Sequence, residues 1–271
     1  MKRLRTILLF SALAIMTALA VGCSDGTTDS DTGADTGTDT DAEVTEEFVF
    51  ANSGAYKPFS FDQGGEIVGF DVDIANEIAE RIGRTPVMNS PVPFDTLIQG
   101  LKAGKYDALV ASHGITAERE EQVDFTRPYY RSGPQIFVQT GTTDINGPDD
   151  LDGRKVGVLK ASTYLDLAAT LTDEGNLVTY DSDVVALQDL TTGRVDAVIT
   201  DKLVGLVARN ESGLEIEAVG DVLMADEMGI AVQEGDSELL AEINQALEDM
   251  IADGTYEEIS LRWFDENILG E

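Results

Sequence analysis

The sequence predicts an α/β protein built as two lobes with a ligand cleft between them. From residue 47 onward, short apolar runs alternate with amphipathic helical stretches, which is typical of α/β folds. The segments Leu101–Ser112 and Leu190–Asp201 also resemble each other, because each reads as a helix end, a glycine, a basic residue and an apolar strand ending in a polar side chain. Parallel sheets bind ligands at the carboxyl ends of their strands, so Ser112 and Asp201 are expected to face one cleft. A chance repeat of a common helix–strand unit is the alternative.

The remaining pattern divides the chain into elements and lobes. We expect a strand at 48–51, a turn at 62–65, an extended run at 67–70, a helix with Ile74, Ile78 and Ile82 on one face, a short helix at 96–103, a strand at 156–159, and closing helices at 237–253 and 255–263. Extended runs at 136–139 and 228–233 are expected to be hinge strands. Lobe 1 then comprises residues 47–138 and 225–271, and lobe 2 comprises residues 139–224.

The first 46 residues are predicted to lie outside the folded part. Residues 1–22 read as a signal peptide, since three basic residues precede an apolar run that is short and rich in alanine. A retained membrane anchor is the alternative. Cys23, the only cysteine, follows small residues and resembles a lipidation site. Residues 23–46 contain almost no apolar side chains and are expected to form a disordered acidic tether. The protein is therefore expected on the extracellular face of the cytoplasmic membrane, anchored by lipid.

The chain is strongly acidic, with a formal net charge of −33, and the acids are spread along its whole length. Removing the signal peptide also removes Lys2, Arg3 and Arg5 and no acid. Concentrated salt screens such self-repulsion, so the charge indicates a halophilic source. An acidic patch for cationic partners is the alternative. Nucleic acid is excluded as a partner, because its phosphates would be repelled.

Several motifs resemble the family 3 extracellular solute-binding proteins, which are the polar amino-acid receptors of ABC transporters. The motifs that carry the match follow the family order: Tyr56–Phe59, Gly69–Ile74, Phe94–Asp95, Ile115–Thr116 with Arg119, and Val123–Tyr130. The resemblance as a whole extends over nearly all of the chain after residue 47. The resemblance implies a type II periplasmic-binding-protein-like fold. It also implies an amino-acid ligand, a permease and an ATPase as partners, a monomer, and no cofactor or metal.

The resemblance also assigns roles to individual residues. Arg119 matches the arginine that binds the ligand α-carboxylate, for which a planar guanidinium is suited. Ser162 and Thr163 match groups that meet the same carboxylate at a helix N-terminus. Asp201 matches the acid that pairs with the α-ammonium, and its alternative is an N-cap for the following helix. Tyr56 and Phe94 match the pair that sandwiches the ligand side chain; as lone aromatics they would be read as core.

Three positions depart from the family pattern. Gly114 stands where a Ser or Thr hydroxyl commonly touches the carboxylate. Ser53 stands where several members carry an Asp that reads the ligand side chain, so we expect a ligand whose side chain is not strongly cationic. His113, the only histidine, lies between Ser112 and Gly114 and is interpreted as structural, with a place in the cleft as its alternative.

Two other functions are compatible with the predicted fold. One is an enzyme similar to cyclohexadienyl dehydratase, and the other is a ligand-sensing module that acts through a membrane partner. The sequence contains no Cys/His or Ser/His nucleophile pattern and no metal-ligand spacing, so we expect a binding protein rather than an enzyme.

Replacing Cys23 with serine tests the predicted lipid anchor. Because serine cannot be acylated through a thioether, the Cys23→Ser protein should move from the membrane fraction to the soluble fraction. Cell fractionation followed by immunoblotting measures this. A variant that stays in the membrane fraction as fully as the wild type would show that the anchor is elsewhere.

Overall fold

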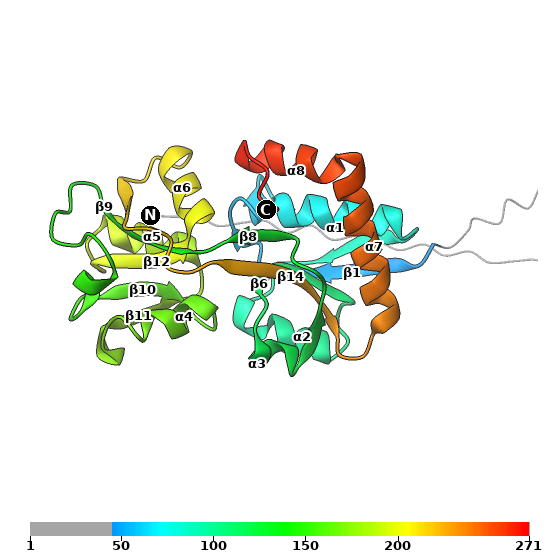
Figure 1. The fold of residues 1–271 in the computed structure, drawn as a ribbon, viewed down its shortest axis with the longest axis horizontal. Helices are drawn as coiled ribbons and strands as arrows, with labels where there is room; N and C mark the ends of the chain where they lie inside the picture. The colour runs from blue at the N-terminus through cyan, green and yellow to red at the C-terminus, as the bar shows by residue number, and fades with distance from the viewer. Residues whose placement is uncertain (1–44, 271) are drawn as a thin grey trace, which may run out of the picture. The chain divides into compact units, whose positions relative to one another are not determined.

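The computed structural model describes residues 45–270. The predicted signal peptide, Cys23 and nearly all of the tether lie outside the described residues. Most of the described chain forms two sheets with helices packed on their faces (Figure 1). We call them, with their helices, the first lobe and the second lobe. No helix between residues 45 and 270 combines the length and the hydropathy needed to cross a membrane.

The first lobe contains a six-stranded sheet of order β5-β1-β6-β14-β7, with β8 also paired to β14. Its strands are β1 (Glu47–Ala51), β5 (Thr85–Asn89), β6 (Ala108–Gly114), β7 (Val123–Phe125), β8 (Tyr130–Ser132) and β14 (Asp226–Gln233). The strands β5, β1 and β6 run parallel, and β14 is antiparallel to β6, β7 and β8. A smaller sheet of β2 (Ala55–Tyr56), β3 (Ser60–Gln63) and β4 (Glu66–Val68) follows β1.

Helices cover both faces of the first sheet. Helix α1 (Phe70–Arg81) contacts β5 and β6 and places Ile74 and Ile78, both fully buried, in the main core. Burying each such side chain contributes about 1.5–3 kcal/mol. Helix α2 (Leu97–Lys102), preceded by the 3₁₀ helix η1 (Phe94–Thr96), belongs to a separate core cluster, and Figure 1 shows it across the sheet from α1. Helix α3 (Ala117–Glu120) follows β6.

The second lobe contains a five-stranded sheet of order β11-β10-β12-β9-β13. Its strands are β9 (Pro134–Gln139), β10 (Val156–Leu159), β11 (Leu177–Tyr180), β12 (Ala197–Asp201) and β13 (Ile216–Val219). Its helices are η2 (Pro148–Leu151), α4 (Thr163–Ala168), η3 (Glu174–Asn176), α5 (Asp183–Thr191) and α6 (Lys202–Asn210). Because β10, β11 and β12 are parallel, their carboxyl ends all lie at the same edge of the sheet, where α4, α5 and α6 begin.

The chain passes between the lobes at Gly133 and at residues 220–225. Strand β9 pairs with β12 and β13 over its whole length, and β14 pairs with strands of the first sheet. The runs expected as hinge strands therefore lie inside the two sheets, and the expected boundary at 138 falls near the end of a second-lobe strand. The two crossings run together, since the Leu223 amide donates to the Pro134 carbonyl over 2.8 Å.

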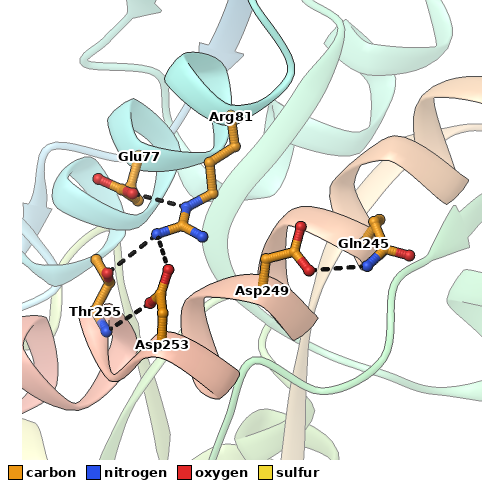
Figure 2. A network of polar contacts seen from close by, with 6 residues as sticks. All are labelled: Glu77, Arg81, Gln245, Asp249, Asp253 and Thr255. Carbon is orange, nitrogen blue, oxygen red and sulfur yellow. Dashed lines mark hydrogen bonds and ion pairs between the residues drawn. The ribbon is translucent and has the colours of Figure 1, made fainter.

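The C-terminal helices α7 (Ser237–Asp253) and α8 (Thr255–Phe264) pack on α1. Gly254 separates them at φ 91°, a conformation that favours glycine. Figure 2 shows the polar contacts at this junction: Arg81 contacts Glu77 over 2.7 Å on its own helix and Asp253 over 2.9 Å on α7. Arg81 also donates to the Thr255 hydroxyl over 3.0 Å. One guanidinium therefore connects three helices of the first lobe.

Gly133 provides a test of the crossing between the lobes. A Cβ atom there would lie 2.1 Å from the Met224 carbonyl oxygen, which is backbone of the other crossing segment. Gly133→Ala should therefore force the two segments apart and destabilise the protein by roughly 1–3 kcal/mol. Gly147, whose φ is −177° and whose Cβ would meet nothing within 4 Å, is the matched control.

Chemical denaturation of both variants measures this difference. Gly147→Ala should stay within about 0.5 kcal/mol of the wild type. Equal stability of the two variants would show that the crossing segments are not held at the observed separation.

Candidate ligand-binding site

A cavity between the two sheets is lined by residues of both lobes. The first lobe contributes Ser53, Ala55, Tyr56, Phe94, Ala111, Ser112, Gly114, Arg119 and Met228, and the second contributes Leu159, Ser162, Thr163, Tyr164, Asp181, Ser182 and Asp183. Of the predicted ligand-binding and specificity residues between 45 and 270, all lie in this wall except Asp201 and His113.

Arg119 joins the two lobes at one side of the cavity. It lies in α3, where the Thr116 hydroxyl caps the helix by accepting from the Arg119 amide. The guanidinium is 9% exposed; Nη1 donates to the Gly114 carbonyl over 2.8 Å and Nη2 to the Ala161 carbonyl over 3.2 Å. Burial lowers the pKa of Arg119, and Asp226 opposes that shift. Arginine keeps its proton in proteins, so the site contains a permanent buried cation.

The start of α4 forms the wall next to Arg119. Ser162 is the N-cap residue: its hydroxyl accepts from the Leu165 amide over 3.3 Å and donates to the Leu159 carbonyl over 2.7 Å. The Thr163 hydroxyl contacts Asp226 Oδ2 over 3.4 Å. The amides of a first helical turn are directed at the helix end, so this wall favours an anion.

Asp201 lies behind the cavity wall and is fully buried. Its Oδ1 accepts from the Ser132 hydroxyl over 2.8 Å and from the Leu203 amide over 2.7 Å. The Leu203 contact is the N-cap of α6, which was the alternative role for this residue. Oδ2 accepts from the Tyr164 hydroxyl over 3.2 Å, and Tyr164 is part of the wall. Burial raises the pKa of Asp201 to about 6.

Asp183 is the buried carboxyl group that reaches the wall itself. It begins α5 directly after β11 and is 3% exposed. The Thr200 hydroxyl donates to Asp183 Oδ1 over 2.6 Å, and burial raises the pKa of Asp183 to about 6. The sequence motifs assigned no role to this residue. The signal was available, because Asp183 stands between a strand end and a helix start, as Ser162 and Asp201 do.

Ser112 is held by a buried network below the cavity. Its φ is 53°, unusual for serine, and its hydroxyl donates to Asp71 Oδ2 over 3.0 Å. The Tyr129 hydroxyl donates to Asp71 Oδ1 over 2.6 Å and accepts from the Ser112 amide over 3.0 Å. The Ser112 hydroxyl and the Ser112 amide are thus both hydrogen-bonded to buried side chains. Asp71 belongs to the motif at 69–74, and burial raises its pKa to about 7.

The aromatic residues of the site rest on other rings. The Phe94 ring stacks on the His113 ring at 4.5 Å between centroids, and the Arg119 Cζ lies 5.9 Å from the Phe94 centroid. His113 is 1% exposed, and burial followed by the charge of Arg119 lowers its pKa. A neutral imidazole behind Phe94 supports that ring from outside the cavity. Tyr56 stacks on Phe59 at 5.3 Å.

Three further contacts join the lobes at the rim of the cavity. Lys160 forms an ion pair with Asp95 of the first lobe over 3.2 Å and also pairs with Asp181. The Ser182 hydroxyl donates to the Ala55 carbonyl over 3.3 Å. Lys57 pairs with Glu211 over 3.0 Å. The side chains of these ion pairs are exposed by 30% or more, so each pair contributes little.

The cavity combines a guanidinium and a helix start on one side with aromatic faces and a carboxyl group elsewhere. This arrangement complements a small molecule that carries both an anion and a cation. Residues 45–270 contain no group of three or more His, Cys, Asp or Glu side chains placed to hold a metal ion. Fold and cavity together define a two-lobed solute-binding protein.

Comparison with known proteins identifies the family. Residues 48–266 match the model of the bacterial extracellular solute-binding proteins, family 3, and the chain belongs to that family. It is 38% identical to an L-arginine-binding protein of Pseudomonas aeruginosa, over 80% of this chain and 87% of that one. It is 32% identical to an L-cystine-binding protein of Escherichia coli (strain K12), over 79% and 81%.

A solved structure supports the same assignment. The structure of an ancestral arginine-binding protein bound to glutamine has a TM-score of 0.77 and 39% sequence identity, and it covers 81% of this chain and 98% of that one. The predicted family and the two-lobed α/β fold class are thereby confirmed.

The buried Asp71 makes stability depend on pH. Because the pKa of Asp71 is about 7 in the folded protein against 3.8 for an unperturbed carboxyl, the folded state binds a proton more tightly than the unfolded state. The stability that this group contributes is therefore present at pH 4 and is lost as the pH rises to 7, by at most about 4 kcal/mol. Asp71→Asn should reduce the decline in stability between pH 4 and 8.

Denaturation of the unliganded protein across this pH range provides the measurement. Asp249→Asn, which removes an exposed carboxyl of α7, serves as the control and should retain the wild-type decline. An unchanged pH dependence in Asp71→Asn would contradict the assigned pKa.

Proposed function

We propose that this solute-binding protein holds an α-amino acid in the cavity between its lobes and delivers it to the permease of an ABC importer. The observation that carries the proposal is the buried guanidinium of Arg119, which forms part of the cavity wall and bonds to both lobes. The relatives support it, because one is an L-arginine-binding protein and another an L-cystine-binding protein.

The ligand α-carboxylate is assigned to Arg119 and the start of α4. The guanidinium supplies paired N–H donors, and the first-turn amides after Ser162 and Thr163 supply others. Gly114 has no hydroxyl for this carboxylate, and a Cβ there would lie 3.1 Å from an Asp226 carboxylate oxygen. The ligand carboxylate would thus be held by donors from both lobes.

The ligand α-ammonium is assigned to Asp201. Its carboxylate is fixed by Ser132 and Leu203 at Oδ1, whereas Oδ2 has a longer bond from the Tyr164 hydroxyl. Rotation of Tyr164 would bring Oδ2 to the cavity, and the ammonium would replace the hydroxyl as donor. A charge-assisted hydrogen bond is roughly twice as strong as a neutral one, which favours this exchange.

Opening and closing of the lobes about Gly133 and residues 220–225 would admit and release the ligand. Apart from the bonds of Arg119, Thr163 and Asp201 described above, the contacts named between the lobes are exposed ion pairs and one hydroxyl–carbonyl bond, which can form and break at small cost. Scattering in solution with and without ligand would measure closure as a decrease in the radius of gyration.

Location, lipid anchoring and source are also part of the proposal. The family is extracellular. Lipidation at Cys23, a disordered tether and a halophilic source are supported by the sequence features and by the net charge of −33. A monomeric state is proposed from the resemblance to the family. Circular dichroism at decreasing salt concentration would test the halophilic source.

The family consists of binding proteins, so this chain is assigned to them and not to the enzymes. One structural relative, at 31% identity, is an ancestral amino-acid-binding protein described as a precursor of cyclohexadienyl dehydratase. That relative is itself an amino-acid-binding protein, so it favours binding over dehydration for this chain.

Truncation of Arg119 tests the proposed site. Arg119→Ala would leave the ligand carboxylate without its cation, which costs roughly 2–5 kcal/mol, or about 30-fold or more in affinity. Calorimetric titration of the wild type against a panel of amino acids first identifies the ligand. Titration of Arg119→Ala with that ligand then measures the loss of affinity. The control is Arg127→Ala, because Arg127 is an exposed arginine paired with Glu248 outside the cavity. Binding by Arg119→Ala within twofold of the wild type would refute the assigned carboxylate site.

A further inference from the structure

The cavity has more acidic groups than an α-amino acid can satisfy. Asp183 forms part of the wall, Asp201 lies behind Tyr164, and Asp226 contacts Thr163 beside Arg119. Within residues 45–270, Arg119 supplies the only guanidinium of the cavity wall. Under the proposed function, the α-carboxylate uses Arg119 and the α-ammonium uses Asp201. Asp183 then has no cationic partner within the ligand backbone.

Asp183 and Arg119 have different hydrogen-bond partners within residues 45–270. Arg119 makes its hydrogen bonds to Gly114 and Ala161, and the charge that most raises its pKa is that of Asp226. Asp183 is bonded to Thr200, and the neighbouring Ser182 reaches Ala55. Its pKa is raised by burial, and no cation is among the groups that shift it. The protein itself therefore leaves this carboxyl without a counter-charge.

Tyr56 places Asp183 at the end of the cavity that receives the ligand side chain. Ala55 and Tyr56 are adjacent in the wall, and Ser182, the residue before Asp183, donates to the Ala55 carbonyl over 3.3 Å, so the start of α5 packs against β2. Tyr56 and Phe94 present the aromatic faces between which a ligand side chain would lie. A side chain extending along these faces, away from Arg119, would end near Asp183.

We infer that Asp183 is a specificity-determining residue that binds a cationic group at the end of the ligand side chain, so that the ligand is a basic α-amino acid. This inference rests on the proposed function of the cavity. It reverses the expectation drawn from Ser53, because the second lobe supplies an acid from α5 in place of the acid missing near β2. An ammonium or guanidinium ligand reduces the excess negative charge of the site, whereas a neutral side chain leaves a buried carboxylate unpaired.

A structural role is the competing explanation for Asp183. Its position in the first turn of α5 suits the helix dipole, and its bond to Thr200 holds the helix against β12. Such a role would affect folding and the affinity for every ligand alike. It would not change the preference between two ligands that differ only in charge.

The test compares L-arginine with L-citrulline, in which a neutral ureido group replaces the guanidinium at nearly the same size. Calorimetric titration of the folded wild-type protein at pH 7.5 in concentrated salt should show arginine binding at least roughly tenfold more tightly than citrulline. In Asp183→Asn this ratio should fall to about threefold or less, mainly through weaker arginine binding. Asp173→Asn removes an exposed carboxyl of the same lobe and should keep the wild-type ratio.

The outcomes separate this inference from the proposed function. If the wild type binds citrulline or another neutral amino acid as tightly as arginine, the inference is overturned and amino-acid binding stands. An unchanged ratio in a folded Asp183→Asn protein also overturns it. If no amino acid binds the wild type, both fail. Should Asp183→Asn not fold, the wild-type ratio alone still decides whether the ligand is basic.

Discussion

The burial of one guanidinium between two sheets is the interaction on which the site depends. Arg119 comes from the first lobe and donates both to Gly114 of its own lobe and to Ala161 of the second. A buried cation needs nearby anionic or carbonyl partners, because its desolvation is costly. Here the partners are the carbonyls of Gly114 and Ala161 and the more distant carboxyl of Asp226. The guanidinium therefore remains able to donate to a carboxylate from a ligand, and the first-turn amides of α4 beside it offer donors to the same anion.

The buried carboxyl groups around the cavity are also ionisable groups whose charged form is costly to bury. Asp71, Asp183 and Asp201 each receive hydroxyl or amide donors, yet burial still raises the pKa of all three. Asp71 has two hydroxyl donors and holds Ser112 in a left-handed conformation. Asp183 is part of the cavity wall, and Asp201 contacts Tyr164 of that wall. Without a ligand these groups are under-compensated, so part of the stability of the site would come from the molecule that it binds.

The acidic surface and the folded core contribute differently to stability. Ion pairs such as those of Arg127 and Arg131 are exposed and weak, and concentrated salt screens them further. The two sheets are instead held by apolar side chains on both faces, with Phe48, Ile74 and Ile78 fully buried. Salt that screens the negative surface therefore removes repulsion and leaves the main stabilising interactions in place.

The sequence by itself determined the family, several of the strands and helices, and about half of the residues that line the cavity. These features are local: helix and strand periodicity, glycine at helix ends and the motif around Asp71 require only neighbouring residues. The roles expected for Ser162 and Arg119 came instead from the resemblance to the family. Only the tertiary structure decided which acids line the cavity. Asp201 and Asp183 both stand between a strand end and a helix start, but Ser132 and Tyr164, distant in sequence, cover Asp201, whereas Asp183 is left in the wall. The crossing at Gly133 was decided in the same way, since the pairing of β9 depends on β12 and β13, more than fifty residues further along the chain.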